Sequence, residues 1–341
     1  MTSNSSGFTS TAVAPHWEKA SLGGTNVHND FDVTVGLCSR NRKGILREVL
    51  LSLIDQTLGA DCFEVVLVDD GSTDGSGEMI AELRPQLPYS LTYLSQAHSG
   101  LATARNTGIR ASRGELILYI DDDVLADPRL LEEHLKNHRE RDLCVCNGWV
   151  NHVTEPARPA KPKFTMADIS TSFFWTSNVS VKRRHLLQAG LFDEDFREYG
   201  WEDQELGLRL MALGLSKHNN YKAIGFHVKG PPKPHNVRGA MAQAEAKART
   251  ALVYIGKHSR LRSRLATGMH PPRLAWAAMN NFGGLFERYC RGQLGLDKTS
   301  ALPGEDELLT GHQAWCLREL CTIHYFRVLR QGAADRRIAG G

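Results

Sequence analysis

The chain has 341 residues, of which 41% are hydrophobic and 23% are charged, so it is long enough for a sizeable buried core and is not intrinsically disordered. The net charge of +3 hides an asymmetry, because the section from residue 236 onward carries 16 Lys/Arg against 8 Asp/Glu. A basic section of this kind favours contact with anionic lipid, an anionic acceptor or nucleic acid, or forms a solvated helical surface.

The ends and the cysteines exclude several classes of protein. Apolar runs stay shorter than 18 residues, which predicts no transmembrane helix. The first thirty residues are polar and lack a signal-peptide core, so we interpret residues 1–30 as a flexible leader. The seven cysteines form no C-x-x-C pair, which disfavours a zinc site and fits reduced thiols. We expect a cytoplasmic protein, at most peripheral at the inner face of the cell membrane.

From residue 31 onward, apolar runs alternate with helical patterns. Strands are predicted over residues 32–37, 63–68, 91–95, 115–120 and 143–150, with helices over 43–57, soon after 72, over 101–112 and after 128. Continuous apolar strands separated by helices predict an α/β fold with a mostly parallel central sheet flanked by helices. In such sheets, ligands bind outside the carboxyl ends of the strands.

A proline-rich loop after Thr154 ends this first half. Strands follow at 178–181 and 221–228, with helices near 183–190 and 201–214. Beyond residue 236 the pattern is helical, with a long helix from Val237, a basic turn or helix at 257–264, an amphipathic helix over 271–293 and a helix around 315–329. We divide the chain into a domain over 31–235, with halves at 31–150 and 165–235, and a basic helical C-terminal extension over 236–341.

Three polar clusters stand at predicted strand ends: residues 38–42, 69–72 and 121–123. In a parallel sheet all three open onto one crevice. Asp121, Asp122 and Asp123 repel one another, so a positive group is expected beside them. Carboxylate oxygens suit Mg²⁺ or Mn²⁺, especially with a diphosphate as a further ligand. The alternative is an Asp-rich turn that caps the next helix.

Further candidates follow in the second half. Glu202 and Asp203 open a helix, where carboxylates are also favoured for structural reasons, and Trp201 before them is interpreted as a platform for a sugar ring beside a general base. His227 ends a strand, and a neutral imidazole completes some carboxylate metal sites. Arg105 lies early in the helix over 101–112 and is either a phosphate or base contact or a surface arginine.

Four segments in order resemble the signature blocks of the family 2 glycosyltransferases, which are inverting GT-A enzymes with nucleotide-sugar donors. They read VTVGLCSRNR, EVVLVDDGSTDGS, GLATARNTGIRASRGELILYIDDD and NVSVKRRHLLQAGLFDEDFREYGWEDQELGLRL. The resemblance covers about Asp32 to His227. It implies a GT-A catalytic domain with a Rossmann-like nucleotide-sugar-binding half over 31–150 and an acceptor and base half over 165–235. The implied reaction moves a sugar to an acceptor hydroxyl, in cell-envelope polysaccharide or glycoconjugate synthesis.

The same resemblance implies roles for individual residues. Asp203 matches the catalytic base, with Glu202 beside it. Apart from the resemblance, the aromatic residue before them makes Trp201 the expected acceptor contact. The implied donor-binding residues are Ser39, Arg40, Asp70, Arg105, Asp121 and Asp122. The implied ligands of a divalent metal, Mn²⁺ or Mg²⁺, are Asp123, Asp121 and His227.

The first block departs from the family pattern. Relatives usually read P-T-Y-N, whereas this chain has Cys38-Ser39-Arg40-Asn41, so we expect the Arg40 guanidinium to stack on the base. A UDP-sugar is the favoured donor, with dTDP and GDP left open. The acceptor is expected to be a saccharide or a lipid-linked sugar. The Q-x-x-R-W motif of processive synthases is absent from the sequence, which favours transfer of one or a few sugars.

Other interpretations remain. A catalytically inactive sugar-nucleotide-binding or scaffold protein would keep the same motifs. A haloacid-dehalogenase-type phosphatase also begins with Asp-x-Asp, but needs Thr or Val where this chain has Leu125. No nucleic-acid-binding motif is recognisable, so we expect no nucleic acid partner. For residues 257–264 and 274–290 two hypotheses stay open, contact with a membrane surface or packing on the catalytic core.

Overall fold

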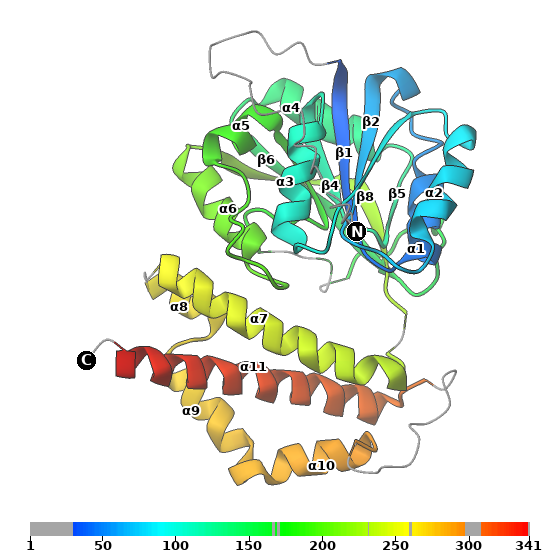
Figure 1. Cartoon of the computed structure of the whole chain (residues 1–341). Helices are drawn as coiled ribbons and strands as arrows, with labels where there is room; N and C mark the ends of the chain where they lie inside the picture. Colours follow the sequence, from blue (N-terminus) through cyan, green and yellow to red (C-terminus); the bar gives the residue numbers. More distant parts are fainter. Residues whose placement is uncertain are drawn as a thin grey trace, which may run out of the picture.

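The computed structural model describes residues 30–165, 168, 171–230, 232–258, 261–296 and 308–339. They form an α/β domain built on one eight-stranded sheet, and a lobe of helices that lies beyond one edge of that domain (Figure 1). The strand order is β3-β2-β1-β4-β7-β6-β8-β5. This is the α/β fold with a helical C-terminal region that the sequence predicts.

The first four strands are parallel, as expected from their apolar runs. They are β1 (Phe31–Ser39), β2 (Phe63–Asp69), β3 (Ser90–Ser95) and β4 (Gly114–Ile120). Every residue of β2 is buried, because helices cover both faces of the sheet. The covering helices here are α1 (Lys43–Ser52), α2 (Ser76–Leu83) and α3 (Leu101–Ala111).

The second half of the sheet is mixed rather than parallel. It contains β5 (Val124–Ala126), β6 (Cys144–Val153), β7 (Asn178–Lys182) and β8 (Ser216–Val228), with helices α4 (Leu130–Glu140), α5 (Arg183–Ala189) and α6 (Glu202–Ala212). β7 runs antiparallel to both β4 and β6, and β5 runs antiparallel to β8. The β5–β8 register pairs Val124 with His227, which brings the end of the aspartate run beside that histidine.

The C-terminal lobe contains α7 (Val237–Lys257), α8 (Leu261–Thr267), α9 (Pro271–Asn280), α10 (Leu285–Gln293) and α11 (Gly311–Ala339). Helices α7 and α11 pack side by side (Figure 1). Short 3-10 helices lie at Ala60–Cys62, Arg84–Gln86, Pro234–Asn236 and Phe282–Gly284.

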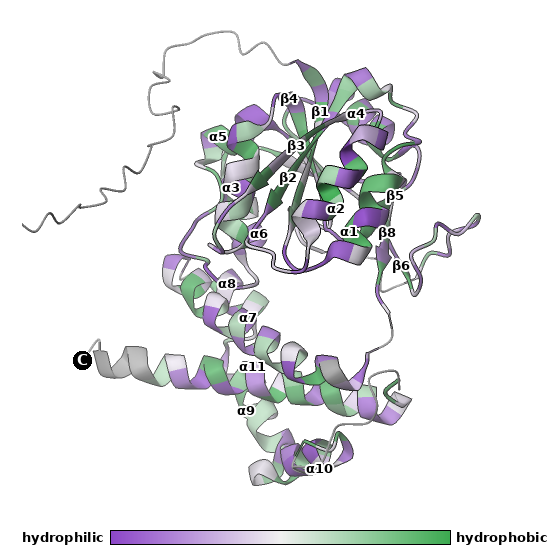
Figure 2. Cartoon of the chain, turned by 45° about the vertical axis from the view of Figure 1, so that its right-hand side comes forward, coloured by the Kyte–Doolittle hydropathy of each residue, from purple (hydrophilic) through white to green (hydrophobic). Residues whose placement is uncertain are grey.

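The prediction of a single amphipathic helix over residues 271–293 is wrong. Gly283 and Gly284 have φ of 67° and 100°, values that glycine adopts at little cost, and together with Phe282 at 43° they break the segment into α9 and α10. Apolar residues fill the strands, whereas the C-terminal helices mix apolar and polar residues along their length (Figure 2). Within the described ranges, none of the helices combines the length and hydropathy needed to cross a bilayer.

Candidate active site

Side chains from β1, the segment after β4 and the end of β8 meet at the carboxyl edge of the sheet. Ser39 Oγ donates a hydrogen bond of 2.6 Å to Asp122 Oδ2. Asp123 Oδ1 lies 3.2 Å from His227 Nε2. Asp121 Oδ2 accepts a 2.5 Å hydrogen bond from Ser177 Oγ. The structure therefore gathers the predicted residues Ser39, Asp121, Asp122, Asp123 and His227, while Arg40 lies exposed just after β1.

The positive group expected beside the aspartates is Arg42 in this structure. Its Nη1 donates a 2.7 Å hydrogen bond to Asp123 Oδ2, and its Nε lies 3.8 Å from Asp122 Oδ1. Arg42 is absent from the predicted site residues, although it belongs to the same polar cluster after β1. Its side chain is 48% exposed, so it is free to leave the carboxylates for another anion.

The three aspartates differ in pKa. Burial raises the pKa of Asp122 to about 6, against the opposing charge of Arg42. Burial also raises the pKa of Asp121, against the charge of Arg105. For Asp123, burial is outweighed by the hydrogen bonds and charges of His227 and Arg42, so its pKa is lowered. Added positive charge would stabilise the ionised forms of Asp121 and Asp122.

These residues fit a divalent cation by donor type. Two carboxylates and an imidazole suit Mn²⁺ or Mg²⁺ with a diphosphate as a further ligand. The Nδ1 atom of His227 is buried and has no hydrogen-bond partner. Such an unsatisfied polar atom costs free energy unless the imidazole binds a ligand or an ion. Among the described residues no three His, Cys, Asp or Glu side chains are already arranged around an ion position. Arg42 would have to withdraw before a cation could bind.

Asp70 ties the loop after β3 to the end of β2. Its carboxylate accepts hydrogen bonds from Gln96 Nε2 at 2.8 Å, Ser99 N at 2.9 Å and Gly100 N at 3.0 Å, and lies 2.7 Å from His98 Nδ1. The pKa of Asp70 is lowered overall, because burial, which favours a higher pKa, is outweighed by these hydrogen bonds. In this structure Asp70 shapes the loop over residues 96–100, and its contact with a base stays a prediction.

Arg105 is buried beneath the carboxylates of α6. Its Nη1 donates to Glu202 Oε1 at 2.7 Å and its Nη2 donates to Thr176 Oγ1 at 2.7 Å. The guanidinium also lies 5.2 Å from the ring centroid of Phe192. The structure thus shows Arg105 orienting Glu202, and a direct contact with donor phosphate or base remains a prediction.

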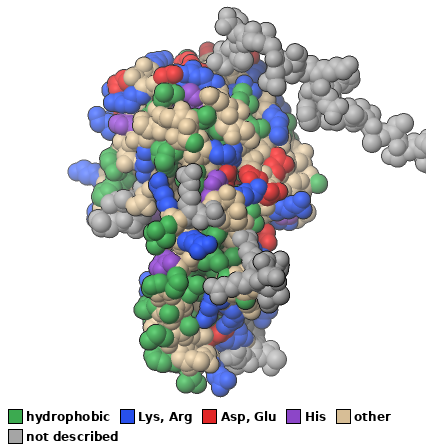
Figure 3. Space-filling view, turned by 90° about the vertical axis from the view of Figure 1, so that its left-hand side faces the viewer, with side chains coloured by type: hydrophobic (Ala, Val, Ile, Leu, Met, Phe, Trp, Pro, Cys, Tyr) green, Lys and Arg blue, Asp and Glu red, His purple; other side chains and the backbone are tan. Residues whose placement is uncertain are grey.

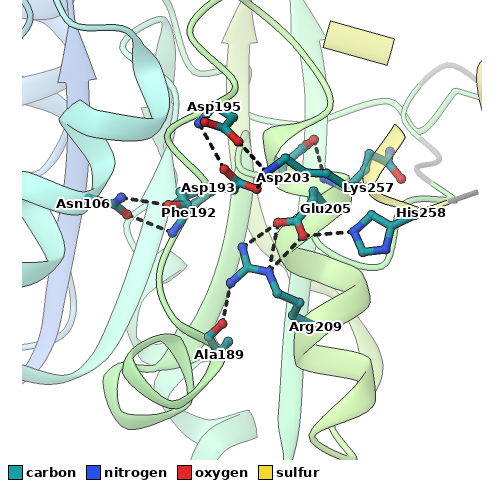
Figure 4. A network of polar contacts seen from close by, with 11 residues as sticks. Asn106, Ala189, Phe192, Asp193, Asp195, Asp203, Glu205, Arg209, Lys257 and His258 are labelled. Atoms are coloured by element: carbon teal, nitrogen blue, oxygen red, sulfur yellow. Dashed lines mark hydrogen bonds and ion pairs between the residues drawn. The ribbon is translucent and has the colours of Figure 1, made fainter. Parts of the chain in front are cut away.

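Asp203 occupies the first turn of α6, where Figure 4 draws it within a network of polar contacts. Its Oδ1 accepts a 2.7 Å hydrogen bond from Gln204 N. Burial first, and then the charge of Glu202, raise the pKa of Asp203 to about 7, against the opposing charge of Arg105. A carboxylate with such a pKa is suited to take a proton from a hydroxyl near neutral pH.

The interpretation of Trp201 as an open sugar platform is contradicted. Trp201 is 9% exposed, and its ring stacks on Tyr254 of α7 with centroids 5.3 Å apart. The indole Nε1 donates to the Lys247 carbonyl at 3.0 Å. Trp201 therefore joins the α/β domain to the C-terminal lobe.

Tyr199 is the aromatic side chain that remains open near this end of α6. It is 49% exposed. Desolvation, and then the charges of Glu202, Asp121 and Asp203, raise the pKa of Tyr199 to about 12. Tyr199 is missing from the predicted site residues, although the sequence EYGWED offers it as an alternative aromatic to Trp201.

Helix α7 holds the loop that leads into α6. Lys257 Nζ lies 2.7 Å from Asp193 Oδ2 and 2.6 Å from Asp195 Oδ2, and His258 Nε2 lies 3.0 Å from Glu205 Oε1 (Figure 4). We call these three contacts, together with the stacking of Trp201 on Tyr254, the α7 clamp. The clamp fixes the segment on both sides of Asp203.

Residues 34–195 match the family model described as glycosyl transferase family 2. Validoxylamine A glucosyltransferase from Streptomyces hygroscopicus subsp. jinggangensis is 28% identical over 319 residues, covering 78% of this chain and 71% of that protein. The uncharacterized glycosyltransferase YfnE from Bacillus subtilis is 29% identical over 249 residues, covering 56% of this chain and 63% of its own length. The chain thus spans less than two thirds of this Bacillus relative.

Among solved structures, the mannosyltransferase PcManGT from Pyrobaculum calidifontis, solved in complex with GDP-Man and Mn²⁺, is similar in fold. The TM-score is 0.55 at 16% identity, and the match covers 92% of this chain and 90% of that one. The likeness extends over both the sheet domain and the helical lobe.

Proposed function

The chain belongs to glycosyl transferase family 2 and has a GT-A fold, and from this premise we propose that it transfers a sugar from a nucleotide-diphosphate sugar to an acceptor hydroxyl with inversion. The observation that carries the proposal is the carboxylate of Asp203, whose pKa is raised to about 7 at the start of α6. Burial and the adjacent charge of Glu202 raise this pKa, as a general base at neutral pH requires. We place the reaction in cell-envelope polysaccharide or glycoconjugate synthesis.

The proposed reaction is a single displacement. Asp203 takes the proton of the acceptor hydroxyl while that oxygen forms a bond to the anomeric carbon. The bond between the anomeric carbon and the diphosphate breaks, and its electron pair leaves with the nucleoside diphosphate. Attack from the face opposite the leaving group inverts the anomeric centre, so no covalent enzyme intermediate is needed.

The donor side of the site is assigned to the aspartate run. Asp121, Asp123 and His227 would hold Mn²⁺ or Mg²⁺, which supplies positive charge against the departing diphosphate when bound. Ser39 and Asp122, which are hydrogen-bonded to each other at 2.6 Å, would contact the ribose or the donor sugar. A UDP-sugar is the favoured donor, and the GDP-Man of the Pyrobaculum structure keeps a GDP-sugar as an alternative.

On the acceptor side, we propose a saccharide or a lipid-linked sugar that approaches Asp203 past Tyr199. The protein is then cytoplasmic, with peripheral membrane contact through the C-terminal lobe. A second candidate function, a catalytically inactive sugar-nucleotide-binding protein, is favoured by one observation: Arg42 pairs with Asp123 at 2.7 Å, where the cation would bind.

A panel of nucleotide sugars, with and without Mn²⁺, separates the two candidates. We expect metal-dependent transfer or donor hydrolysis with one donor, and a product of inverted configuration by NMR. Asp203→Asn should lower turnover by roughly 10²–10⁴-fold and leave nucleotide binding intact. Asp61→Asn, at an exposed carboxylate in the 3-10 helix Ala60–Cys62, is the matched control. Nucleotide binding without turnover of any donor would instead support the inactive binding protein.

A further inference from the structure

The bend between α9 and α10, residues 276–289, exposes large apolar side chains close together in the chain. We call this segment the elbow. Its exposed members are Trp276 (46%), Met279 (72%), Phe282 (71%), Leu285 (67%) and Tyr289 (48%). Apolar residues on a monomer surface are usually scattered singly, so this concentration calls for a partner.

Met279, Phe282 and Leu285 take no part in the hydrophobic clusters of the lobe, whereas Tyr289 forms a 2.9 Å hydrogen bond with His312 of α11. Helix α9 contacts the core of the lobe through Leu274 and Ala277, and α10 does so through Phe286 and Cys290. Trp276 and Met279 are three residues apart, and Leu285 and Tyr289 are four apart, so each pair lies on one face of its helix. A Cβ on Gly283 or Gly284 would meet nothing within 4 Å, so these glycines are not required by close packing. Their positive φ values instead allow the chain to change direction between α9 and α10.

The charged residues around the elbow are mostly basic. Residues 261–296 contain five arginines and one acid, Glu287. Glu287 is paired with Arg327 of α11, so its charge is neutralised within the lobe. The guanidinium of Arg273 lies 4.3 Å from the ring centroid of Trp276. Figure 3 shows apolar and basic side chains together on the surface of this lobe.

Apolar side chains at a bend, surrounded by arginines, match the interface of a membrane that contains anionic lipid. The rings and aliphatic groups enter the boundary between headgroups and acyl chains, and the guanidinium groups meet lipid phosphates. A second copy of this chain is a poorer partner, because it would bring the same positive charge against the elbow.

The elbow is also well placed for such a contact. It lies at the end of the molecule remote from the α/β domain (Figure 1). The same lobe holds the loop before α6 through the α7 clamp, so the membrane contact and the base belong to one connected unit.

We propose that the elbow docks the protein on an anionic membrane surface. The sequence predicts membrane contact over residues 257–264 and 274–290. The proposed contact surface is smaller and is limited to the elbow, because Leu274 and Cys290 pack inside the lobe. The docking proposal does not depend on the proposed transfer activity. Only the idea that the membrane supplies the acceptor rests on the proposed function.

Vesicle flotation of the full chain tests the proposal, with vesicles of phosphatidylcholine alone or mixed with phosphatidylglycerol. We expect binding to the anionic vesicles that weakens with salt. The triple variant Met279→Ser/Phe282→Ser/Leu285→Ser should bind about tenfold more weakly or less. Arg288→Gln should weaken binding about fivefold. The matched control, Leu143→Ser/Leu187→Ser/Tyr221→Ser, changes three exposed apolar residues of the α/β domain and should float as the wild type does.

Three results would overturn the docking. One is a wild-type protein that stays unbound with anionic vesicles, and another is a triple variant that floats normally. The third is sedimentation showing a wild-type dimer that the triple variant abolishes, since a second copy would then cover the elbow. Donor hydrolysis without vesicles should be equal in the wild type and the triple variant, so a failure of docking is distinguished from a failure of the transfer function.

Discussion

Asp203 and Glu202 are neighbours in sequence, yet only Glu202 has a direct cationic partner. Arg105, itself buried, pairs with Glu202 at 2.7 Å. The Oε2 atom of Glu202 is buried and has no hydrogen-bond partner. Burial, and then the negative charge of Glu202, raise the pKa of Asp203 to about 7, which makes Asp203 a stronger base than an ordinary aspartate.

The pH dependence of kcat/KM should report this arrangement. Because the base acts when deprotonated, activity should rise with pH through about 7, the pKa of Asp203. Glu202→Gln removes the neighbouring negative charge, which lowers the pKa of Asp203 and moves the acid limb to lower pH. The measurement is kcat/KM over pH for both proteins, and an unmoved limb would exclude Asp203 as the titrating base.

Arg42 should compete with a divalent cation for Asp123. Arg42→Gln removes the 2.7 Å pair and should raise the affinity for Mn²⁺ in the absence of donor by about tenfold. Electron paramagnetic resonance titration of free Mn²⁺ measures this directly. Arg47→Gln, on the exposed side of α1 and paired with Glu48, is the control. Equal Mn²⁺ affinity in the wild type and Arg42→Gln would show that the cation binds elsewhere.

Among the elements, α7 contacts the residue that immediately precedes α6. Trp201 has φ of 70°, an unusual value for a residue with a side chain, immediately before Asp203's helix. The stacking with Tyr254 and the hydrogen bond to the Lys247 carbonyl stabilise this backbone conformation. The α7 clamp therefore sets the direction in which α6 begins.

Tyr254→Ala should lower kcat about tenfold and leave KM for the donor nearly unchanged, because the proposed donor contacts lie on β1 and after β4. Tyr254→Phe keeps the stacked ring and should retain most of the activity. Steady-state kinetics with each substrate varied in turn provide the measurement. If Tyr254→Ala lowered the melting temperature without changing kcat, the α7 clamp would have a purely structural role.

The elements that could be predicted from sequence are those with long apolar runs. The strands β1, β2, β3 and β4 and their helices follow from such runs. β5 has only three residues and depends on pairing with β8, so local pattern carries no signal for it. The break at Gly283 and Gly284 was hidden because apolar residues continue on both sides of it.

The candidate site was predictable to a similar extent. The meeting of Ser39 with Asp122 follows from parallel strands that end at one edge. Trp201 was misinterpreted because its partner, Tyr254, lies 53 residues further on, and no local pattern shows which aromatic ring will be covered. Arg42 was missed because the polar cluster after β1 contains two arginines, and only the folded chain shows which one reaches the aspartates.

For the whole molecule, the two parts share a hydrophobic core. Phe196 and Trp201 of the α/β domain pack with residues of α7, α9 and α11, including Tyr254 and Phe326. Burial of such a large aromatic side chain contributes about 3 kcal/mol. The helical lobe therefore contributes to the stability of the α/β domain.

A protein truncated after Asn236 should have a lower melting temperature and a tendency to aggregate, because Phe196 and Trp201 become exposed. Thermal unfolding followed by circular dichroism, with light scattering, measures both effects. A truncated protein that is monomeric and keeps full turnover would show that the shared core is dispensable.

The shared core also bears on the order of events during synthesis on the ribosome. The strands and the segment through Trp201 emerge before Tyr254, and well before Phe326, so this aromatic surface must wait uncovered while the later helices are made. A nascent chain that has completed its sheet would still lack the helices that cover Trp201 at the start of α6. The proposed base, Asp203, would therefore reach its final environment only after the later helices have docked.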